Sequence, residues 1–158
     1  MSGSLPLFLA IGCTNVALVL AFVGLSAPSG SHRPTVHGPL ERAIGNLHWV
    51  SPSVRSGAEP RTSRAFSALR RLGVRTIVSV DGARPDVASA VRHGMRYVHI
   101  PIGYEGLPAS AVKSLTRVMR ECERPIFVHC HHGKHRGPAA AAICGLIAGE
   151  FDTEAALS

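Results

Sequence analysis

The sequence has few aromatic residues and no paired cysteines. Phe, Trp and Tyr make up 5% of its 158 residues, and they are not interleaved with any Lys/Arg-rich run. Single-stranded nucleic acid is bound by basic grooves with aromatic stacking platforms, so we expect no nucleic-acid partner. The four cysteines, Cys13, Cys122, Cys130 and Cys144, form no CxxC pair. This spacing argues against a disulfide framework or a structural zinc site and favours reduced thiols.

Residues 1–31 carry no charged side chain, and 5–27 is an almost wholly apolar stretch. It is long enough to cross a bilayer, and it lacks the basic start and short apolar region of a secretory signal. We therefore predict an N-terminal apolar helix at 1–31 that acts as a membrane anchor, with an export signal as the alternative. The first positive charges, Arg33 and Arg42, follow it. They favour a single-pass protein with a cytoplasmic domain over an exported, periplasmic one.

The rest of the chain is expected to hold a linker and one domain. Pro, Ser, Gly and His are frequent up to Pro39, and we place a linker at 32–43 and the folded domain at 44–158. A hydrophobic content of 46% is enough for a single core. The formal net charge of +7 favours an acidic partner, such as a phosphorylated ligand or an anionic membrane surface.

Apolar, β-branched runs alternate with segments of helical periodicity. They predict strands at 47–50, 54–56, 76–80, 97–102 and 126–129, and helices at 62–72, 85–93, from 108 onward and at 138–148. Alternation of this kind implies an α/β layered sandwich with a largely parallel central sheet flanked by helices. Ligands of such folds bind beyond the carboxyl ends of the strands.

The last predicted strand leads directly into a loop with a cysteine and an arginine five residues apart, Cys130 and Arg136. A loop between a strand and a helix can turn its N–H groups inward, and the helix N-terminus adds a positive partial charge, so a phosphate dianion would bind there. The same field favours the thiolate form of Cys130, which is the nucleophilic form. Arg136 supplies a planar guanidinium able to hold two phosphate oxygens.

At these residues the chain resembles the cysteine-dependent protein tyrosine phosphatase superfamily, whose signature is His-Cys, five residues, Arg. The loop is most similar to that of the atypical dual-specificity phosphatases of the plant and fungal type, and the similarity extends to 54–60, 72–78 and 97–102. It implies hydrolysis of phosphate monoesters through a phosphocysteine, with no metal and no cofactor. The implied substrate is a phosphorylated protein or a polyphosphorylated inositol or lipid.

Two carboxylates are candidates for the general acid that protonates the leaving group. Asp81 and Glu105 each follow a predicted strand that should end at the same edge of the sheet as Cys130. The resemblance selects Glu105, because many relatives carry the acid in the loop after the strand that corresponds to 97–102. Asp81 stays open as the alternative.

The remaining loop residues are expected to contact the substrate. They are His131, His132, Gly133, Lys134 and His135. The side chains would ring the pocket mouth with positive or protonatable groups, and Gly133 would allow the tight loop backbone.

Two features depart from the pattern of the family. Gly137 stands where relatives usually carry a Ser or Thr hydroxyl that helps the cysteine leave, and the chain ends at Ser158, about one helix beyond the loop. The second feature leaves open a longer parent protein. Both keep a second hypothesis open, a catalytically weak or inactive phosphate-binding pseudophosphatase at the membrane. A metal site is not expected, since no second Cys/His pair accompanies the loop.

Overall fold

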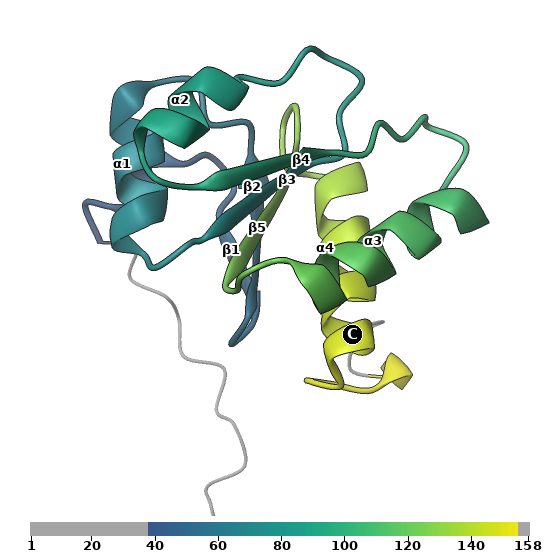
Figure 1. Cartoon of the computed structure of the whole chain (residues 1–158). Helices are drawn as coiled ribbons and strands as arrows, with labels where there is room; N and C mark the ends of the chain where they lie inside the picture. The colour runs from purple at the N-terminus through teal and green to yellow at the C-terminus, as the bar shows by residue number, and fades with distance from the viewer. Residues whose placement is uncertain (1–37, 155–158) are drawn as a thin grey trace, which may run out of the picture. The chain divides into compact units, whose positions relative to one another are not determined.

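A computed structural model describes residues 38–154 of the chain, which fold around one five-stranded sheet (Figure 1). The elements follow one another as η1 (Glu41–Ala43), β1 (His48–Ser51), β2 (Val54–Ala58), α1 (Ser63–Arg71), β3 (Thr76–Ser79), α2 (Val87–Arg92), β4 (Arg96–His99), α3 (Ala109–Glu121), β5 (Ile126–Cys130) and α4 (Arg136–Ala148). The strands are ordered β1-β2-β5-β3-β4. β1 pairs with β2 in antiparallel fashion, and all other pairs are parallel.

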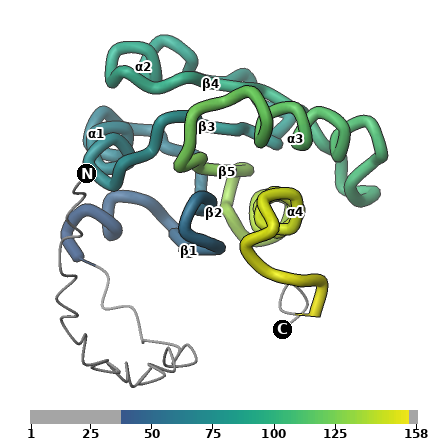
Figure 2. Tube along the Cα trace, turned by 60° about the horizontal axis from the view of Figure 1, so that its bottom comes forward, coloured from purple at the N-terminus to yellow at the C-terminus, as the bar shows by residue number. Residues whose placement is uncertain are grey.

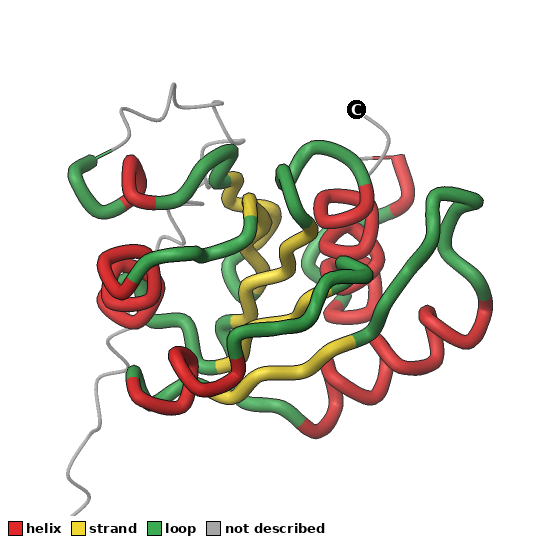
Figure 3. The backbone as a smooth tube through the Cα atoms, turned by 90° about the horizontal axis from the view of Figure 1, so that it is seen from above, coloured by secondary structure: helices red, strands yellow, loops and turns green. Residues whose placement is uncertain are grey.

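Helices cover both faces of the sheet. Figures 2 and 3 show α1 and α2 on one side of the strands and α3 and α4 on the other. Each pair of helices closes its own apolar cluster, one centred on Phe66, Leu69 and Phe127, the other on Leu115, Val128 and Ala141. The predicted α/β layered sandwich with a largely parallel sheet is therefore confirmed for the described residues.

Sequence explains why β5 lies at the centre of this sheet. Every residue of β5, Ile126–Cys130, is buried, and so is every residue of β3. Strands of a parallel sheet covered on both faces consist of near-continuous apolar, β-branched residues. β5 lies between β2 and β3, with Ala58 opposite Cys130 on one side and Ser79 opposite His129 on the other. The cysteine is therefore placed at the carboxyl end of the central strand.

Two element boundaries differ from the sequence prediction, the start of α4 and the end of β4. Helix α4 begins at Arg136, whereas the sequence predicted a start at 138. Pro138 is tolerated in the first helical turn, because the N–H groups of that turn have no intrahelical acceptor. Strand β4 ends at His99, so the predicted extension to Ile102 was wrong. The residues beyond His99 form part of the loop that leads past the site.

The predictions for the N-terminal part fall largely outside the described residues. The apolar segment 1–31 lies there entirely, and the linker 32–43 lies there up to residue 37. Leu40 and Ala43, which were assigned to the linker, pack against the cluster that holds Phe66. Within 38–154, none of the helices has the length and apolar character needed to span a membrane.

Candidate active site

Cys130 is the last residue of β5, and its side chain belongs to the buried core, with the residue 4% exposed. The loop 131–135 turns the chain around, and α4 starts at Arg136. Two loop carbonyl groups are held by neighbouring elements: the Glu59 N–H donates to His131 O (3.3 Å), and Asn46 Nδ2 donates to His132 O (2.8 Å). The loop thus joins the nucleophile candidate to a helix N-terminus, where an anion is favoured.

Gly133 fixes the tight path of this loop. Its φ of +69° lies in the left-handed region, and a Cβ atom on it would lie 2.2 Å from the carbonyl carbon of Gly57 and 2.4 Å from the nitrogen of Ala58. A side chain at this position would therefore overlap the backbone at the end of β2. Only glycine meets both requirements, the backbone conformation and the close approach.

The guanidinium of Arg136 is held from two other loops. Its Nη1 donates to Ile102 O at 2.9 Å, and its Nη2 donates to Asp81 Oδ1 at 2.9 Å. Tyr104 lies over it, with the ring centroid 4.4 Å from Cζ and the hydroxyl 3.3 Å from Nη2. The fold therefore brings Cys130 and Arg136 of one loop together with the segments that follow β3 and β4.

Asp81 is a buried carboxylate that faces this arginine. Burial by itself raises the pKa of Asp81, but hydrogen bonds from the Gly82 N–H and from Arg136, together with the charges of Arg136 and His131, outweigh burial and lower that pKa. Asp81 is therefore ionised at neutral pH and forms an ion pair with Arg136.

Asp81→Asn is expected to destabilise the domain by about 1–3 kcal/mol at pH 7, because Arg136 loses its charged partner in a buried setting. A carboxyl with a lowered pKa contributes stability above its unfolded pKa and loses that contribution as the pH falls through its folded pKa. The difference between wild type and variant should therefore shrink in acid. Urea unfolding at several pH values measures it, and a difference independent of pH would contradict the ion pair.

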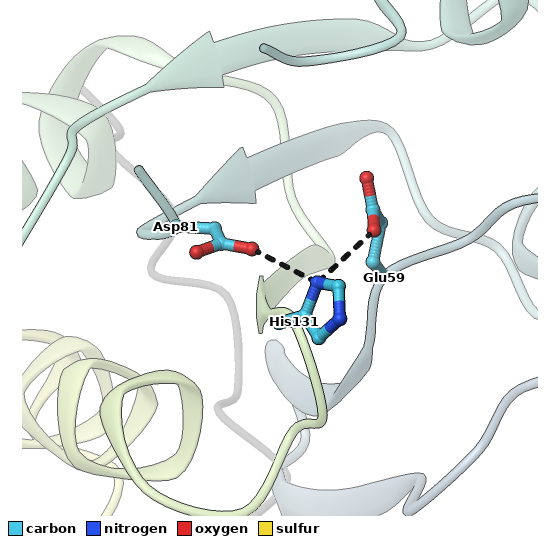
Figure 4. A group of neighbouring side chains, drawn as sticks. All are labelled: Glu59, Asp81 and His131. Carbon is cyan, nitrogen blue, oxygen red and sulfur yellow. Dashed lines mark ion pairs between the residues drawn. The ribbon is translucent and has the colours of Figure 1, made fainter. Parts of the chain in front are cut away.

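His131 lies between two carboxylates at the mouth of the site (Figure 4). Its Nδ1 is 3.6 Å from Asp81 Oδ2 and 3.7 Å from Glu59 Oε2. One imidazole and two carboxylates, with ligand atoms within 4.8 Å of one another, form a donor set that could hold a metal ion. Arg61, however, already contacts two of these side chains: its Nε is 2.8 Å from Glu59 Oε2, and its Nη2 is 2.9 Å from the His131 ring nitrogens. A positive charge is thus already supplied at this position.

His129, the residue before the cysteine, forms hydrogen bonds at the end of β5. It is 1% exposed, and burial lowers its pKa to about 4, so the ring is neutral at pH 7. Its Nδ1 is 3.4 Å from the carbonyl oxygen of Cys130, which can only accept, so Nδ1 carries the proton. Nε2 then accepts from the Tyr97 hydroxyl at 2.7 Å. Burial raises the pKa of Tyr97 to about 12, so this phenol stays a donor.

The sequence-predicted site residues are only partly brought together. Cys130, Gly133, Arg136, Asp81 and His131 converge around the loop. His132, Lys134 and His135 are exposed along its outer side. Glu105 is exposed next to Tyr104, and in the described part of the chain it makes no hydrogen bond or ion pair.

Sequence reasoning missed three residues at the site. Glu59 and Arg61 follow β2, and the sequence does not reveal that β2 pairs with β5. Tyr104 precedes Glu105 in the loop after β4, and the sequence analysis gave it no role. An exposed aromatic residue in a loop after a parallel strand was the one available signal for it.

Comparison with known proteins finds relatives of this chain. No family model matches the chain. The dual specificity protein phosphatase TpbA of Pseudomonas aeruginosa (strain UCBPP-PA14) is 31% identical over 116 residues, which cover 71% of this chain and 51% of that protein. A crystal structure of P. aeruginosa TpbA in complex with phosphotyrosine superposes with a TM-score of 0.55 at 26% identity, covering 71% of this chain and 69% of that one.

These relatives support the resemblance of the chain to the cysteine-dependent protein tyrosine phosphatase superfamily. The resemblance to its atypical dual-specificity members is confirmed, and cysteine-based phosphatases are the enzyme class of its relatives. The chain spans about half the length of the TpbA proteins that it matches.

Two further structures share this fold. A DUF442 protein from Shewanella putrefaciens CN-32 superposes with a TM-score of 0.61 at 24% identity, covering 73% of this chain and 80% of that one. The core catalytic domain of the PP-IP phosphatase SIW14 from S. cerevisiae superposes with a TM-score of 0.55 at 18% identity, covering 72% and 83%. At these identities the likeness is one of fold.

Proposed function

We propose that this protein hydrolyses phosphate monoesters through a phosphocysteine formed on Cys130. The observation that carries the proposal is the position of Cys130 and Arg136 at the two ends of one loop, at the carboxyl end of the central strand and the N-terminus of α4. A thiolate nucleophile, loop N–H groups and a bidentate cation are the groups that phosphoryl transfer to sulfur requires. The chemistry involves no metal and no organic cofactor.

The reaction would run in two steps. Cys130 Sγ attacks the phosphorus atom, the bond to the leaving oxygen breaks, and a carboxylic acid protonates that oxygen. Water then attacks the phosphocysteine, the phosphorus–sulfur bond breaks, and the electron pair stays on sulfur as thiolate. The carboxylate takes the proton of the attacking water, so acid and base are one residue.

Glu105 is the better candidate for this acid. The Asp81 carboxylate is held by the Gly82 N–H and by Arg136, so it is not free to approach a leaving group. Glu105 is exposed in the loop that also carries Tyr104, whose ring lies over Arg136. We therefore assign Asp81 to positioning Arg136 and Glu105 to proton transfer.

An anionic substrate suits the rim of the site. His131, His132, Lys134 and His135 lie in the loop itself, and Arg61 lies beside it. TpbA has been crystallised with phosphotyrosine, and SIW14 is a PP-IP phosphatase. We propose a phosphorylated protein as the substrate, with a polyphosphorylated small molecule or lipid as the second candidate, favoured by the number of cationic groups at the rim.

The membrane location proposed from residues 1–31 is independent of this chemistry. The absence of charge over that segment supports an anchored protein with a cytoplasmic domain, and an exported protein is the alternative. Fractionation of cells that express the full chain distinguishes the two.

Hydrolysis of an aryl phosphate by the full chain tests the proposed reaction. Cys130→Ser is expected to reduce kcat at least about a thousandfold, because the serine hydroxyl is a far weaker nucleophile than a thiolate. Cys122→Ser, at the end of α3, is the matched control and should keep wild-type activity. Vanadate should inhibit, and a chelator should have no effect. A folded wild-type protein that binds phosphate without turnover would instead establish the pseudophosphatase.

A further inference from the structure

The first turn of α4 packs against β2 and β5 without an intervening side chain. A Cβ atom placed on Gly137 would lie 3.1 Å from the backbone nitrogen of Cys130 and 3.4 Å from the Oγ of Ser56. Two atoms from different strands thus border the same point beside the nucleophile. Residue 137 offers no hydroxyl there, and Ser56 does.

Ser56 lies on the side of the sheet that faces the cysteine. It pairs with Val128 in the parallel β2–β5 ladder, two positions before the pair of Ala58 and Cys130. Alternate residues of a strand share one face, so Ser56 and Ala58 lie on one face of β2, as Val128 and Cys130 do on β5. Val128 and Cys130 belong to the apolar cluster closed by α3 and α4. The hydroxyl of Ser56 is therefore enclosed between β2, β5 and the start of α4.

This hydroxyl is fully buried and unsatisfied. Ser56 is 0% exposed, and across residues 38–154 its Oγ has no hydrogen-bond partner. Buried polar groups normally find a partner, since leaving one unpaired costs free energy, so an exception needs an explanation. Val128 lies opposite Ser56 in the sheet, and Gly137, whose Cβ position borders the Cys130 nitrogen, lies next to the Oγ of Ser56.

We propose that the Ser56 hydroxyl donates a hydrogen bond to the Cys130 thiolate and thereby stabilises it, both in the resting enzyme and as the leaving group. A neutral thiol is a weak acceptor, whereas a thiolate is a charged one, so the partner of Ser56 appears only in the ionised form. Rotation about the Cα–Cβ bond of Ser56 redirects its O–H within the space bordered by the start of α4. The role as leaving-group stabiliser rests on the proposed phosphatase function.

In the second step of that reaction, the phosphorus–sulfur bond breaks and its electron pair moves onto Sγ. Negative charge develops on sulfur as water adds to phosphorus and passes its proton to Glu105. Ser56 transfers no proton. Its O–H dipole is aimed in advance at the atom that becomes charged, which lowers the barrier of this step. Ser56 is accordingly a positioning donor on β2 that serves where residue 137 supplies no hydroxyl.

The first test measures the ionisation of Cys130 directly. The rate of alkylation by iodoacetamide, followed over pH in the full chain with Cys130→Ser as background, gives a pH midpoint. In Ser56→Ala we expect this midpoint to rise by about one pH unit, because the thiolate loses a hydrogen bond to a charged group. Ser51→Ala removes another buried hydroxyl, at the end of β1 opposite Val54, and should leave the midpoint unchanged. An unchanged midpoint in Ser56→Ala overturns the proposal.

A second variant moves the hydroxyl from the strand to the helix. In Ser56→Ala combined with Gly137→Ser, the oxygen at 3.4 Å from the new Cβ is gone. The Cys130 nitrogen at 3.1 Å and the His129 carbonyl carbon at 3.4 Å remain, so the backbone there must yield slightly. The pH midpoint should return toward the wild-type value. With an aryl phosphate, Ser56→Ala should slow phosphoenzyme breakdown about tenfold and produce a burst, and the double variant should remove the burst. A shift in Ser56→Ala that the relocated hydroxyl does not reverse would show a packing effect and reject the hydrogen bond.

Thermal unfolding accompanies these measurements. Ser56→Ala removes an unpaired buried hydroxyl, so we expect the melting temperature to stay equal or to rise, which ensures that the variant is folded. Failure of the proposed function would appear as an inactive wild type, and the alkylation midpoint would still decide the role of Ser56. Normal hydrolysis with an unshifted midpoint would reject the Ser56 proposal alone.

Discussion

Arg136→Lys is expected to lower kcat/KM for an aryl phosphate by about a hundredfold to a thousandfold, the range found when a donor to the developing charge is lost. The guanidinium is oriented by two fixed acceptors, Ile102 O and Asp81 Oδ1, each at 2.9 Å. An ammonium group is a point charge on a flexible stem, so it cannot keep both anchors and also present two parallel N–H groups to a phosphate. Steady-state kinetics and vanadate titration measure the loss.

The matched control for this variant is Arg117→Lys. Arg117 lies on α3, 78% exposed at its side chain, in an ion pair with Glu121. Exposed pairs of this kind contribute little to stability, and we expect wild-type kinetics from the control. Vanadate affinity equal to wild type in Arg136→Lys would contradict the proposed role of the guanidinium in holding the phosphoryl oxygens.

Gly133→Ala is expected to abolish measurable hydrolysis and to lower the melting temperature. The new methyl group would lie 2.2 Å from the Gly57 carbonyl carbon, at a φ of +69° that disfavours any side chain. Because the contact is with backbone at the end of β2, neither partner can rotate away, and the loop must shift as a whole. The free energy of unfolding should fall by about 2–4 kcal/mol, the range of serious steric conflicts in a packed interior. Urea unfolding measures it.

Gly73→Ala separates the two causes of this loss. Gly73 has a φ of +86°, but no atom of the described structure lies within 4 Å of a Cβ placed on it. The variant therefore carries the backbone penalty without the overlap, and it should cost about 1 kcal/mol while leaving the kinetics unchanged. Equal costs for Gly73→Ala and Gly133→Ala would disprove the close approach between the loop and β2.

Local patterns predicted most of the elements and the central loop. The apolar run before Cys130 and the Ala-rich segment after Arg136 specify a strand and a helix by composition alone, and the loop between them follows. The start of α4 was misplaced because Pro138 was taken as the first residue of the helix. Proline is also tolerated at the third position of the first turn, which is where Pro138 lies.

Contacts between strands that are distant in the chain could not be predicted from the sequence. The pairing of β2 with β5 places Ser56 and Glu59 beside the loop, yet nothing in residues 54–60 specifies that neighbour. The ion pair of Asp81 with Arg136 has the same origin, since both residues were recognised but their contact depends on β3 lying next to β5. The sequence therefore indicated which side chains could act at a phosphate site, whereas the order of the strands determines which of them contact one another.

The central position of β5 also gives the two sides of the site different mobilities. Amides of a strand paired on both sides exchange with solvent only when the sheet itself opens, so Cys130 should be among the last residues to be exposed by fluctuations. Glu105 lies on an exposed loop and has no hydrogen bond or ion pair within the described residues, and such segments move on faster timescales. Under the proposed function, the nucleophile would stay fixed while the proposed proton donor, Glu105, would be free to approach and withdraw. Adaptation to leaving groups of different size would therefore require changes in the 103–106 loop and none in the sheet.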